Sequence, residues 1–183
     1  MSILNWEKLS SKYLVRAPWA TLRVDTCKMP DGTLIPEYYV LEYPNWVNVI
    51  ALTEDDQVIL VRQYRHAVGE EILEIPGGVI EENESPEQAA RRELLEETGY
   101  KFTSFEFLAD LYANPSTANN KTHCFLAKGG IKTSDQKLDR GEELIVELVS
   151  LAELKELVLN NKLGQSLHTS GVFYALVKLG LLK

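Results

Sequence analysis

Three glutamates, Glu93, Glu96 and Glu97, stand at positions i, i+3 and i+4 of a segment with the composition of a helix. This spacing places three carboxylates on one helix face. Like charges at these offsets destabilise a helix by roughly 0.2–0.5 kcal/mol per pair. A solvated acidic face is the common explanation of such a helix in general. The alternative is a hard divalent cation, which prefers oxygen ligands and would neutralise the cluster.

Both ends of the helix that carries these glutamates are indicated by the sequence. Ser85 can cap its N-terminus, Pro86 suits the first helical position, and Gln88 completes a capping box. Gly99 suits the C-terminus, because a residue there commonly takes the left-handed conformation that glycine tolerates. We therefore predict a helix over residues 86–98.

The stretch from residue 77 to residue 100, GGVIEENESPEQAARRELLEETGY, resembles the signature of the Nudix hydrolase family. Its glycine and polar positions correspond here to Gly78, Glu84, Arg92, Glu93, Glu96, Glu97 and Gly99. Leu94 matches the inner apolar position, and Tyr100 stands where an aliphatic residue is more usual. A match at this many fixed positions is far more specific than a lone glycine motif. The full spacing therefore favours a metal site over a solvated acidic face.

The resemblance implies that the box binds Mg²⁺, or alternatively Mn²⁺, against the diphosphate of a substrate. By position, Glu93 and Glu97 correspond to the main metal ligands, and Glu96 to a third ligand that acts directly or through water. The carbonyl group of Gly77, just before the box, would also face a metal. Gly78 keeps the turn sterically open.

Two further residues of the box have expected roles that follow from the same resemblance. Arg92 is expected to orient the glutamates through salt bridges, and we count it with Glu96 among the catalytic residues. Glu84 is expected to play a lesser part in metal binding. Pairing of Glu84 with a nearby arginine is an equally good interpretation.

The sequences that flank the box resemble the ADP-ribose pyrophosphatase branch of the family. They are RQYR at residues 62–65, EILEIPGG at residues 71–78, and Pro115, fifteen residues after Tyr100. The branch usually has alanine where Gly77 stands. The flanks imply a nucleoside diphosphate sugar as substrate.

Three flanking residues are candidates for substrate contacts under this resemblance. Arg65 matches the arginine that contacts the diphosphate, and its guanidinium suits bidentate phosphate binding. For Arg62, a surface ion pair is the better interpretation. Glu74 is a candidate for a ribose hydroxyl or an outer-sphere water, although a plain strand residue is nearly as good an interpretation.

A catalytic base and a platform for the nucleobase complete the expected site. In the family the base often comes from an acidic loop before the last strand, which here is the segment 139–143. Alignment favours Glu142, with Glu143 close behind. Adenine gains from stacking on an aromatic side chain, and Trp46 and Trp19 are candidates, with core packing as the alternative for both.

The function implied by the resemblance is metal-dependent hydrolysis of ADP-ribose to AMP and ribose 5-phosphate. Alternatives within the family are GDP-mannose, NADH or a dinucleoside polyphosphate as substrate. A catalytically silent domain that senses ADP-ribose is a weaker alternative, because such domains usually lose box glutamates. A homodimer is also implied, because the N-terminal sheet of this branch commonly exchanges between subunits.

Composition excludes some classes of protein. The chain has 183 residues, net charge −8 and a pI close to 5.0. A general nucleic-acid binder needs a basic face, so we expect no nucleic-acid partner. No apolar run is long enough to span a bilayer and no secretory segment is evident, so we expect a cytoplasmic protein with no membrane partner.

The cysteines and histidines add little to the expected chemistry. Cys27 and Cys124 match no zinc spacing, and free buried thiols are the better interpretation. His66, His123 and His168 form no ligand pattern, which disfavours zinc.

The elements that position these residues fall into two parts. Residues 1–45 predict a small antiparallel β unit, with strands at 21–25 and 34–41 around a turn at 30–32 and a possible short helix within residues 1–13. Residues 46–183 predict the Nudix domain. Its strands are expected at 47–52, 57–64, 72–75, 105–111, 122–126 and 144–149, and its further helices at 150–160 and 173–179. Strands around a central helix, with helices near the C-terminus, predict an α/β (α+β) fold with a mixed sheet covered on both faces, in agreement with the α/β/α sandwich that the resemblance implies.

Overall fold

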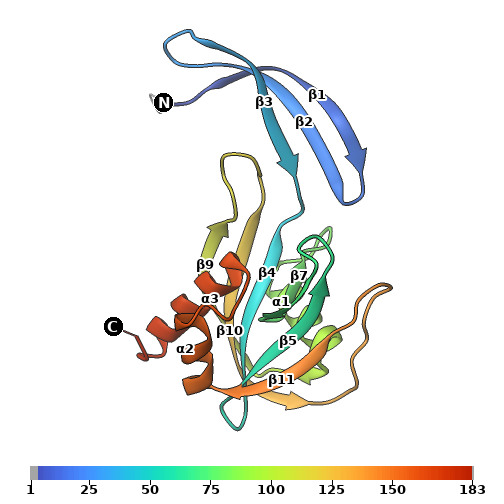
Figure 1. The fold of residues 1–183 in the computed structure, drawn as a ribbon, viewed down its shortest axis with the longest axis vertical. Coiled ribbons are helices and arrows are strands. Elements are labelled where there is room, and N and C mark those ends of the chain that lie inside the picture. The colour runs from blue at the N-terminus through green and yellow to red at the C-terminus, as the bar shows by residue number, and fades with distance from the viewer. Residues whose placement is uncertain (1–3, 183) are drawn as a thin grey trace. The chain divides into compact units, whose positions relative to one another are not determined.

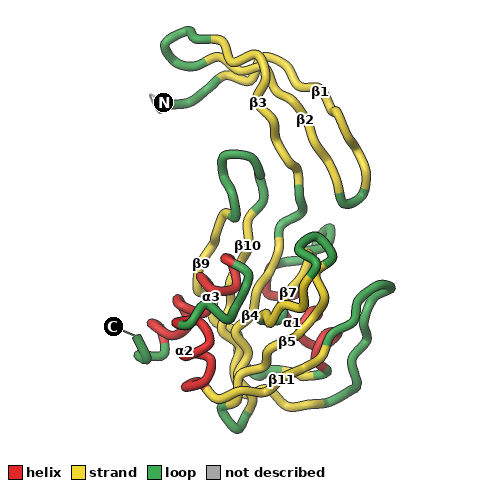
Figure 2. The backbone as a smooth tube through the Cα atoms, in the orientation of Figure 1, coloured by secondary structure: helices red, strands yellow, loops and turns green. Residues whose placement is uncertain are grey.

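The computed structural model describes residues 4–182 of the chain, which divides into two compact units. The first unit contains the N-terminal residues as far as Pro44 together with residues 112–120. The second unit contains residues 45–111 and the chain from Lys121 onward. Each unit has its own sheet (Figures 1 and 2).

The first unit is a three-stranded antiparallel sheet in the order β1-β2-β3. Its strands are β1 (Glu7–Ala17), β2 (Ala20–Lys28) and β3 (Leu34–Glu42). Between β2 and β3, Gly32 has a φ of 90° and the side chain of Asp31 accepts a hydrogen bond from the N–H of Thr33. The turn predicted at residues 30–32 is therefore confirmed.

Residues 7–17 form a strand, so the short helix considered for residues 1–13 is wrong over its described part. β1 pairs with β2 from Glu7, opposite Lys28, to Ala17, opposite Ala20. This long hairpin ladder satisfies the backbone groups of β1 that face β2, whereas an isolated helix of that length is marginal in water. Residues 1–3 lie outside the described part of the chain.

The second unit contains an eight-stranded mixed sheet in the order β11-β5-β4-β10-β8, with β6 beside β5, β7 beside β4 and β9 beside β10. The strands are β4 (Trp46–Thr53), β5 (Gln57–Arg65), β6 (Glu70–Glu74), β7 (Gly77–Val79), β8 (Tyr100–Lys101), β9 (Ser104–Tyr112), β10 (Lys121–Lys132) and β11 (Ile145–Ser150). β10 and β4 are parallel, and β5 is antiparallel to β4, β6 and β11.

Helices cover both faces of this sheet: α1 (Pro86–Thr98) on one, and α2 (Leu151–Leu159) and α3 (Ser166–Lys178) on the other (Figure 1). Alternate residues of β4 show this division, because Val47 and Val49 pack in the core with α1, whereas Ile50 and Leu52 pack in the core with α2 and α3. The predicted α/β/α sandwich is confirmed. No helix within residues 4–182 is long and apolar enough to cross a membrane.

The observed ends of the helices show where local sequence signals were sufficient to predict them. Ser85 and Gln88 form the capping box of α1, and Gly99 ends the helix with a φ of 77°. α3, however, begins at Ser166, seven residues before the predicted start at residue 173. Gly171 weakens the helical pattern there, yet it packs on the sheet, where a Cβ would lie 3.4 Å from Sγ of Cys124.

Candidate active site

Two consecutive glycines bring β7 against the glutamates of α1. The N–H of Gly77 donates to Oε2 of Glu97 at 3.0 Å. A Cβ on Gly78 would lie 2.3 Å from Oε1 of Glu93, so glycine leaves the space that this carboxylate occupies. A Cβ on Gly77 would lie 2.1 Å from the carbonyl oxygen of Val47. This contact is a steric reason for glycine at position 77 of this chain.

Glu97 and Glu93 are carboxylates in an environment that disfavours their charge. Glu97 is 6% exposed, and burial raises its pKa well above the usual range, with a further increase from the charge of Glu93, against the opposing hydrogen bond from Gly77. Burial also raises the pKa of Glu93, against the opposing charge of Arg92. A nearby divalent cation would reverse both shifts, because positive charge favours the ionised forms.

Arg92 is the centre of an ion-pair network among partly buried side chains of the box. Its Nε and Nη2 donate to Glu84 at 3.0 and 2.9 Å, and its Nη1 donates to Glu93 at 2.9 Å and to Glu96 at 3.0 Å. The bond to Arg92 lowers the pKa of Glu84, and the same bond raises the pKa of Arg92. Arg92 therefore lies where it can orient the glutamates.

The donors in this region are oxygen atoms, which suit Mg²⁺ or Mn²⁺ better than zinc. Within the described residues, no three acidic, histidine or cysteine side chains converge into a complete metal site. The box carboxylates are divided between two partners, since Arg92 holds Glu93 and Glu96 while Gly77 holds Glu97. Glu93 and Glu97 fit a cation best, because they are the two whose charge is disfavoured by burial.

The loop before β11 carries Glu142, the first candidate for the catalytic base. Burial is the main cause of the raised pKa of Glu93 and Glu97, and the charge of Glu142 makes a smaller contribution in the same direction. Glu142 is held in a tight turn, in which the N–H of Asp139 donates to its Oε2 at 3.0 Å and its own N–H donates to the carbonyl of Asp139 at 3.1 Å. Glu143, the second candidate, is exposed beside it.

The two arginines of the RQYR segment have different partners. Nε and Nη2 of Arg65 donate to the two oxygens of Glu74, at 3.2 and 2.7 Å, and Gln63 donates to the same carboxylate at 3.0 Å. The side chain of Glu74 is 2% exposed, whereas that of Arg65 is 45% exposed. Arg62 pairs with Glu147 at 2.6 Å on the surface, which confirms the ion pair expected of Arg62.

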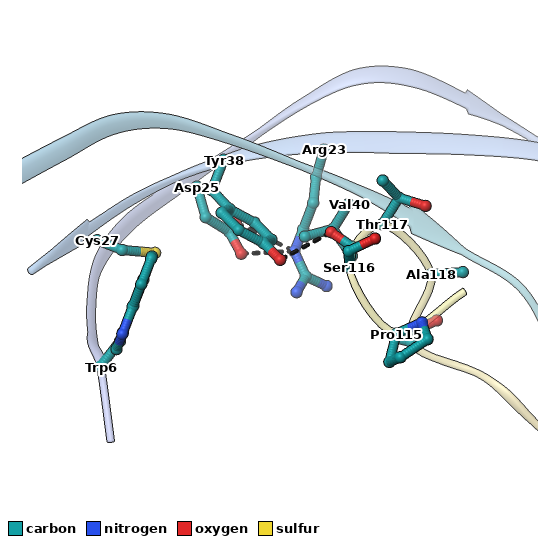
Figure 3. Close-up of a pocket in the computed structure, with 11 residues that line it drawn as sticks. Trp6, Arg23, Asp25, Cys27, Tyr38, Val40, Pro115, Ser116, Thr117 and Ala118 are labelled. Carbon is teal, nitrogen blue, oxygen red and sulfur yellow. Dashed lines mark hydrogen bonds and ion pairs between the residues drawn. The ribbon is translucent and has the colours of Figure 1, made fainter. Parts of the chain in front are cut away.

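The first unit contains an aromatic pocket of about 280 Å³ (Figure 3). Its lining consists of Trp6, Arg23, Asp25, Cys27, Tyr38, Val40 and the loop residues 115–119. The rings of Trp6 and Tyr38 meet edge to face, with centroids 5.9 Å apart. Sequence reasoning gave neither ring a role in the site, because Trp6 precedes β1 and Tyr38 lies in β3, and only the folded sheet brings them together.

The predicted nucleobase platforms lie elsewhere. Trp19 is 77% exposed at the turn between β1 and β2, and Trp46 is half-buried at the start of β4 in the second unit. Cys27 and Cys124 are free and buried, as predicted. His168 is buried in α3, and burial lowers its pKa to about 4.

Comparison with known families identifies the family of the chain. The NUDIX domain family matches residues 43–168, and the nucleoside diphosphate sugar hydrolase N-terminal domain family matches residues 6–41. The chain therefore belongs to the Nudix family, and it is a pyrophosphohydrolase.

Individual relatives support the same conclusion. The methanol dehydrogenase activator of Bacillus methanolicus is 34% identical over 130 residues, which cover 71% of this chain and 69% of that protein. The ADP-ribose pyrophosphatase of Bacillus subtilis (strain 168) is 30% identical over 159 residues, covering 86% of this chain and 85% of that one. A crystal structure of an ADP compounds hydrolase is similar over 100% of both chains, with a TM-score of 0.85 and 24% identity, which shows the shared fold.

Proposed function

We propose that this chain hydrolyses the diphosphate bridge of ADP-ribose to AMP and ribose 5-phosphate, with Mg²⁺ as cofactor and Mn²⁺ as an alternative. The observation that carries the hydrolase chemistry is the placement of Glu93 and Glu97 against the glycine backbone of β7. The substrate is supported by the Bacillus subtilis relative, whose name is ADP-ribose pyrophosphatase, and by the match to an N-terminal domain of nucleoside diphosphate sugar hydrolases.

In this proposal Glu93 and Glu97, with Glu96 and the carbonyl of Gly77, hold the cation. When bound, the ion would withdraw charge from the diphosphate and lower the pKa of a water molecule. Arg92 holds Glu93 and Glu96 in position, and Glu84 anchors Arg92 from the other side.

The remaining residues bind the diphosphate and accept a proton. Arg65 presents a half-exposed guanidinium to the phosphates, and we assign Glu74 to orient it, because the buried carboxylate holds one edge of the guanidinium through two hydrogen bonds. Glu142 accepts a proton from the attacking water, with Glu143 as the alternative base. This assignment is supported by the place of Glu142 in the acidic loop before β11, the last strand, from which the base of this family often comes.

The nucleobase is proposed to stack on an aromatic side chain. Trp19 and Trp46 are candidates, and the pocket with Trp6 and Tyr38 adds a third place for a flat ring. A homodimer that forms through the first unit is supported by its exposed apolar residues, Leu9, Tyr13, Leu14, Val15 and Trp19. Light scattering at micromolar concentration tests the dimer, and a monomer would contradict it. The cytoplasmic location stays a prediction.

Release of AMP from ADP-ribose by the purified protein tests the function. GDP-mannose, NADH and a diadenosine polyphosphate are assayed in parallel, each with MgCl₂ and with chelator. We expect fast cleavage of ADP-ribose that requires the metal. Preferential cleavage of another compound would keep the hydrolase and reject the substrate. Binding of ADP-ribose without cleavage of any compound would favour a sensor and reject the proposed enzyme function.

A further inference from the structure

The chain between β10 and β11 is tied to the C-terminal end of α1, the helix that carries the glutamates (Figure 1). The N–H groups of Thr133 and Ser134 donate to the carbonyl of Gly99 at 2.9 and 3.2 Å, and the N–H of Lys137 donates to the carbonyl of Glu96 at 2.8 Å. A Cβ on Gly99 would lie 2.1 Å from the carbonyl oxygen of Ser134. The last glycine of the box therefore leaves room for this segment.

Gln136 adds a side-chain connection to these backbone bonds. Its Nε2 donates to the carbonyl of Glu97 at 2.6 Å and to the carbonyl of Leu144 at 3.2 Å. Both partners are acceptors, so the amide nitrogen, with its two hydrogens, is the atom that faces them. One half-buried side chain thus joins the residue with the buried carboxylate to the chain two residues after Glu142.

These bonds close a loop around Glu142. The neck of the loop is the contact between Gln136 and Leu144, and the neck is attached to α1 through Glu97. Within the loop, the turn between Asp139 and Glu142 holds the carboxylate of Glu142 against the backbone of Asp139. The position of Glu142 relative to α1 is therefore set in part by the amide of Gln136.

We propose that Gln136 is a positioning residue of the hydrolase, which holds the loop that carries Glu142 against the C-terminal end of α1. The inference rests on the proposed function, in which Glu142 accepts the proton of the attacking water. Gln136 does not touch substrate. It acts through the loop, and a displacement of about 1 Å in a reacting group can cost on the order of 10²-fold in rate.

Gln136→Leu removes the donor and nearly keeps the size of the side chain. We expect kcat for ADP-ribose to fall about 10–100-fold, with KM changed less than about twofold, because the diphosphate contacts are untouched. Amide hydrogen exchange in the peptide that spans residues 137–144 should become faster, while exchange in α1 stays as in the wild type. Gln57→Leu is the matched control, since Gln57 is exposed at the start of β5 and outside the site.

A double-mutant cycle tests whether Gln136 acts through Glu142. In a Glu142→Gln background, Gln136→Leu should cause no further loss of kcat, because the group that it positions is already gone. Losses that multiply would overturn the proposal. Gln136→Glu, which keeps the length but lacks the donor, should reproduce the loss of kcat and the faster exchange.

The exchange measurement separates this proposal from the proposed function. Unchanged exchange in Gln136→Leu, or faster exchange with wild-type kcat, would overturn the positioning role. If the wild-type protein cleaves none of the nucleotides, the proposed function fails, and with it the catalytic part of this inference. Faster exchange of the loop would then still support the tether itself.

Discussion

Glu97→Gln removes the charge of the buried carboxylate and keeps its contacts in the fold. The amide has nearly the same shape, and its oxygen can still accept the N–H of Gly77, which bonds Oε2 at 3.0 Å. What is lost is the negative charge that would face a cation. We expect turnover of ADP-ribose in MgCl₂ to fall by at least about 10²–10³-fold, the range found when one group that stabilises transition-state charge is removed.

The same substitution should change the stability of the protein in opposite directions with and without metal. Folding raises the pKa of Glu97 from about 4.5, so the folded state binds more protons than the unfolded state above that pH. In chelator, the free energy of unfolding of the wild type should therefore decrease as pH rises from about 4.5 through the raised pKa of Glu97 in the folded protein. Glu97→Gln has no carboxylate to ionise at this position, so at pH values above the raised pKa of Glu97 it should be more stable than the wild type.

Added Mg²⁺ should reverse that order. An ion present at about 100 times its Kd adds about 2.7 kcal/mol to the stability of a protein that binds it only when folded. For a domain of this size that is an increase of roughly 5–10 °C in Tm. The variant should gain little, because one of the two best-placed ligands is gone.

Thermal unfolding by circular dichroism, with MgCl₂ and with chelator, measures these changes beside the assay of AMP release. Glu87→Gln is the control, since Glu87 lies on the same helix, pairs with Arg91 and has a side chain that is 49% exposed. The control should keep wild-type turnover and the full shift in Tm with Mg²⁺. Wild-type turnover in Glu97→Gln, or an equal shift in Tm, would refute the metal assignment.

Three further predictions concern other parts of the site and of the fold. Arg65→Ala should lower kcat/KM for ADP-ribose about 10–100-fold, as expected for lost charge-assisted hydrogen bonds, and Arg62→Ala far less; equal losses would show that the wrong arginine was assigned. Gly78→Ala should raise the Mg²⁺ concentration needed for half-maximal turnover, because the new Cβ would meet Oε1 of Glu93 at 2.3 Å; an unchanged Mg²⁺ titration would contradict this. The neutral form of His168 is favoured on folding, so about 3 kcal/mol of stability present above pH 6.5 should be lost as pH falls toward 4, and denaturant unfolding of His168→Leu should lack that loss.

Residues close together in the sequence made α1 predictable. The cap at Ser85, the box with Gln88 and the stop at Gly99 are local rules, and each appears in the structure. The same reasoning failed at residues 7–17, because a strand gains its hydrogen bonds from a partner that the local sequence does not reveal. It also missed the early start of α3, where packing of Gly171 on the sheet outweighs its low helix propensity.

Within the site, sequence spacing predicted which carboxylates share a helix face, but it could not predict their partners. Only the fold shows that Arg92 pairs with Glu93 and Glu96, while Glu97 accepts a hydrogen bond from the backbone of β7. The link from Gln136 to Glu97 also lay beyond sequence reasoning, because the two residues are 39 positions apart and no motif connects them.

At three positions of this region the need for glycine has one steric cause, which a rule for helix caps or turns alone does not supply. A Cβ on Gly77, Gly78 or Gly99 would lie 2.1–2.3 Å from an oxygen atom of another residue: the carbonyl of Val47, the carboxylate of Glu93 or the carbonyl of Ser134. Each glycine is thus a point where another part of the second unit approaches the chain. The first contact packs β7 against β4, the second places the carboxylate of Glu93, a proposed metal ligand, and the third packs the loop of the proposed base against the end of α1. The glycine positions of the box are therefore explained by close packing with β4, with Glu93 and with the loop after β10, just as its glutamate positions are explained by the proposed metal site.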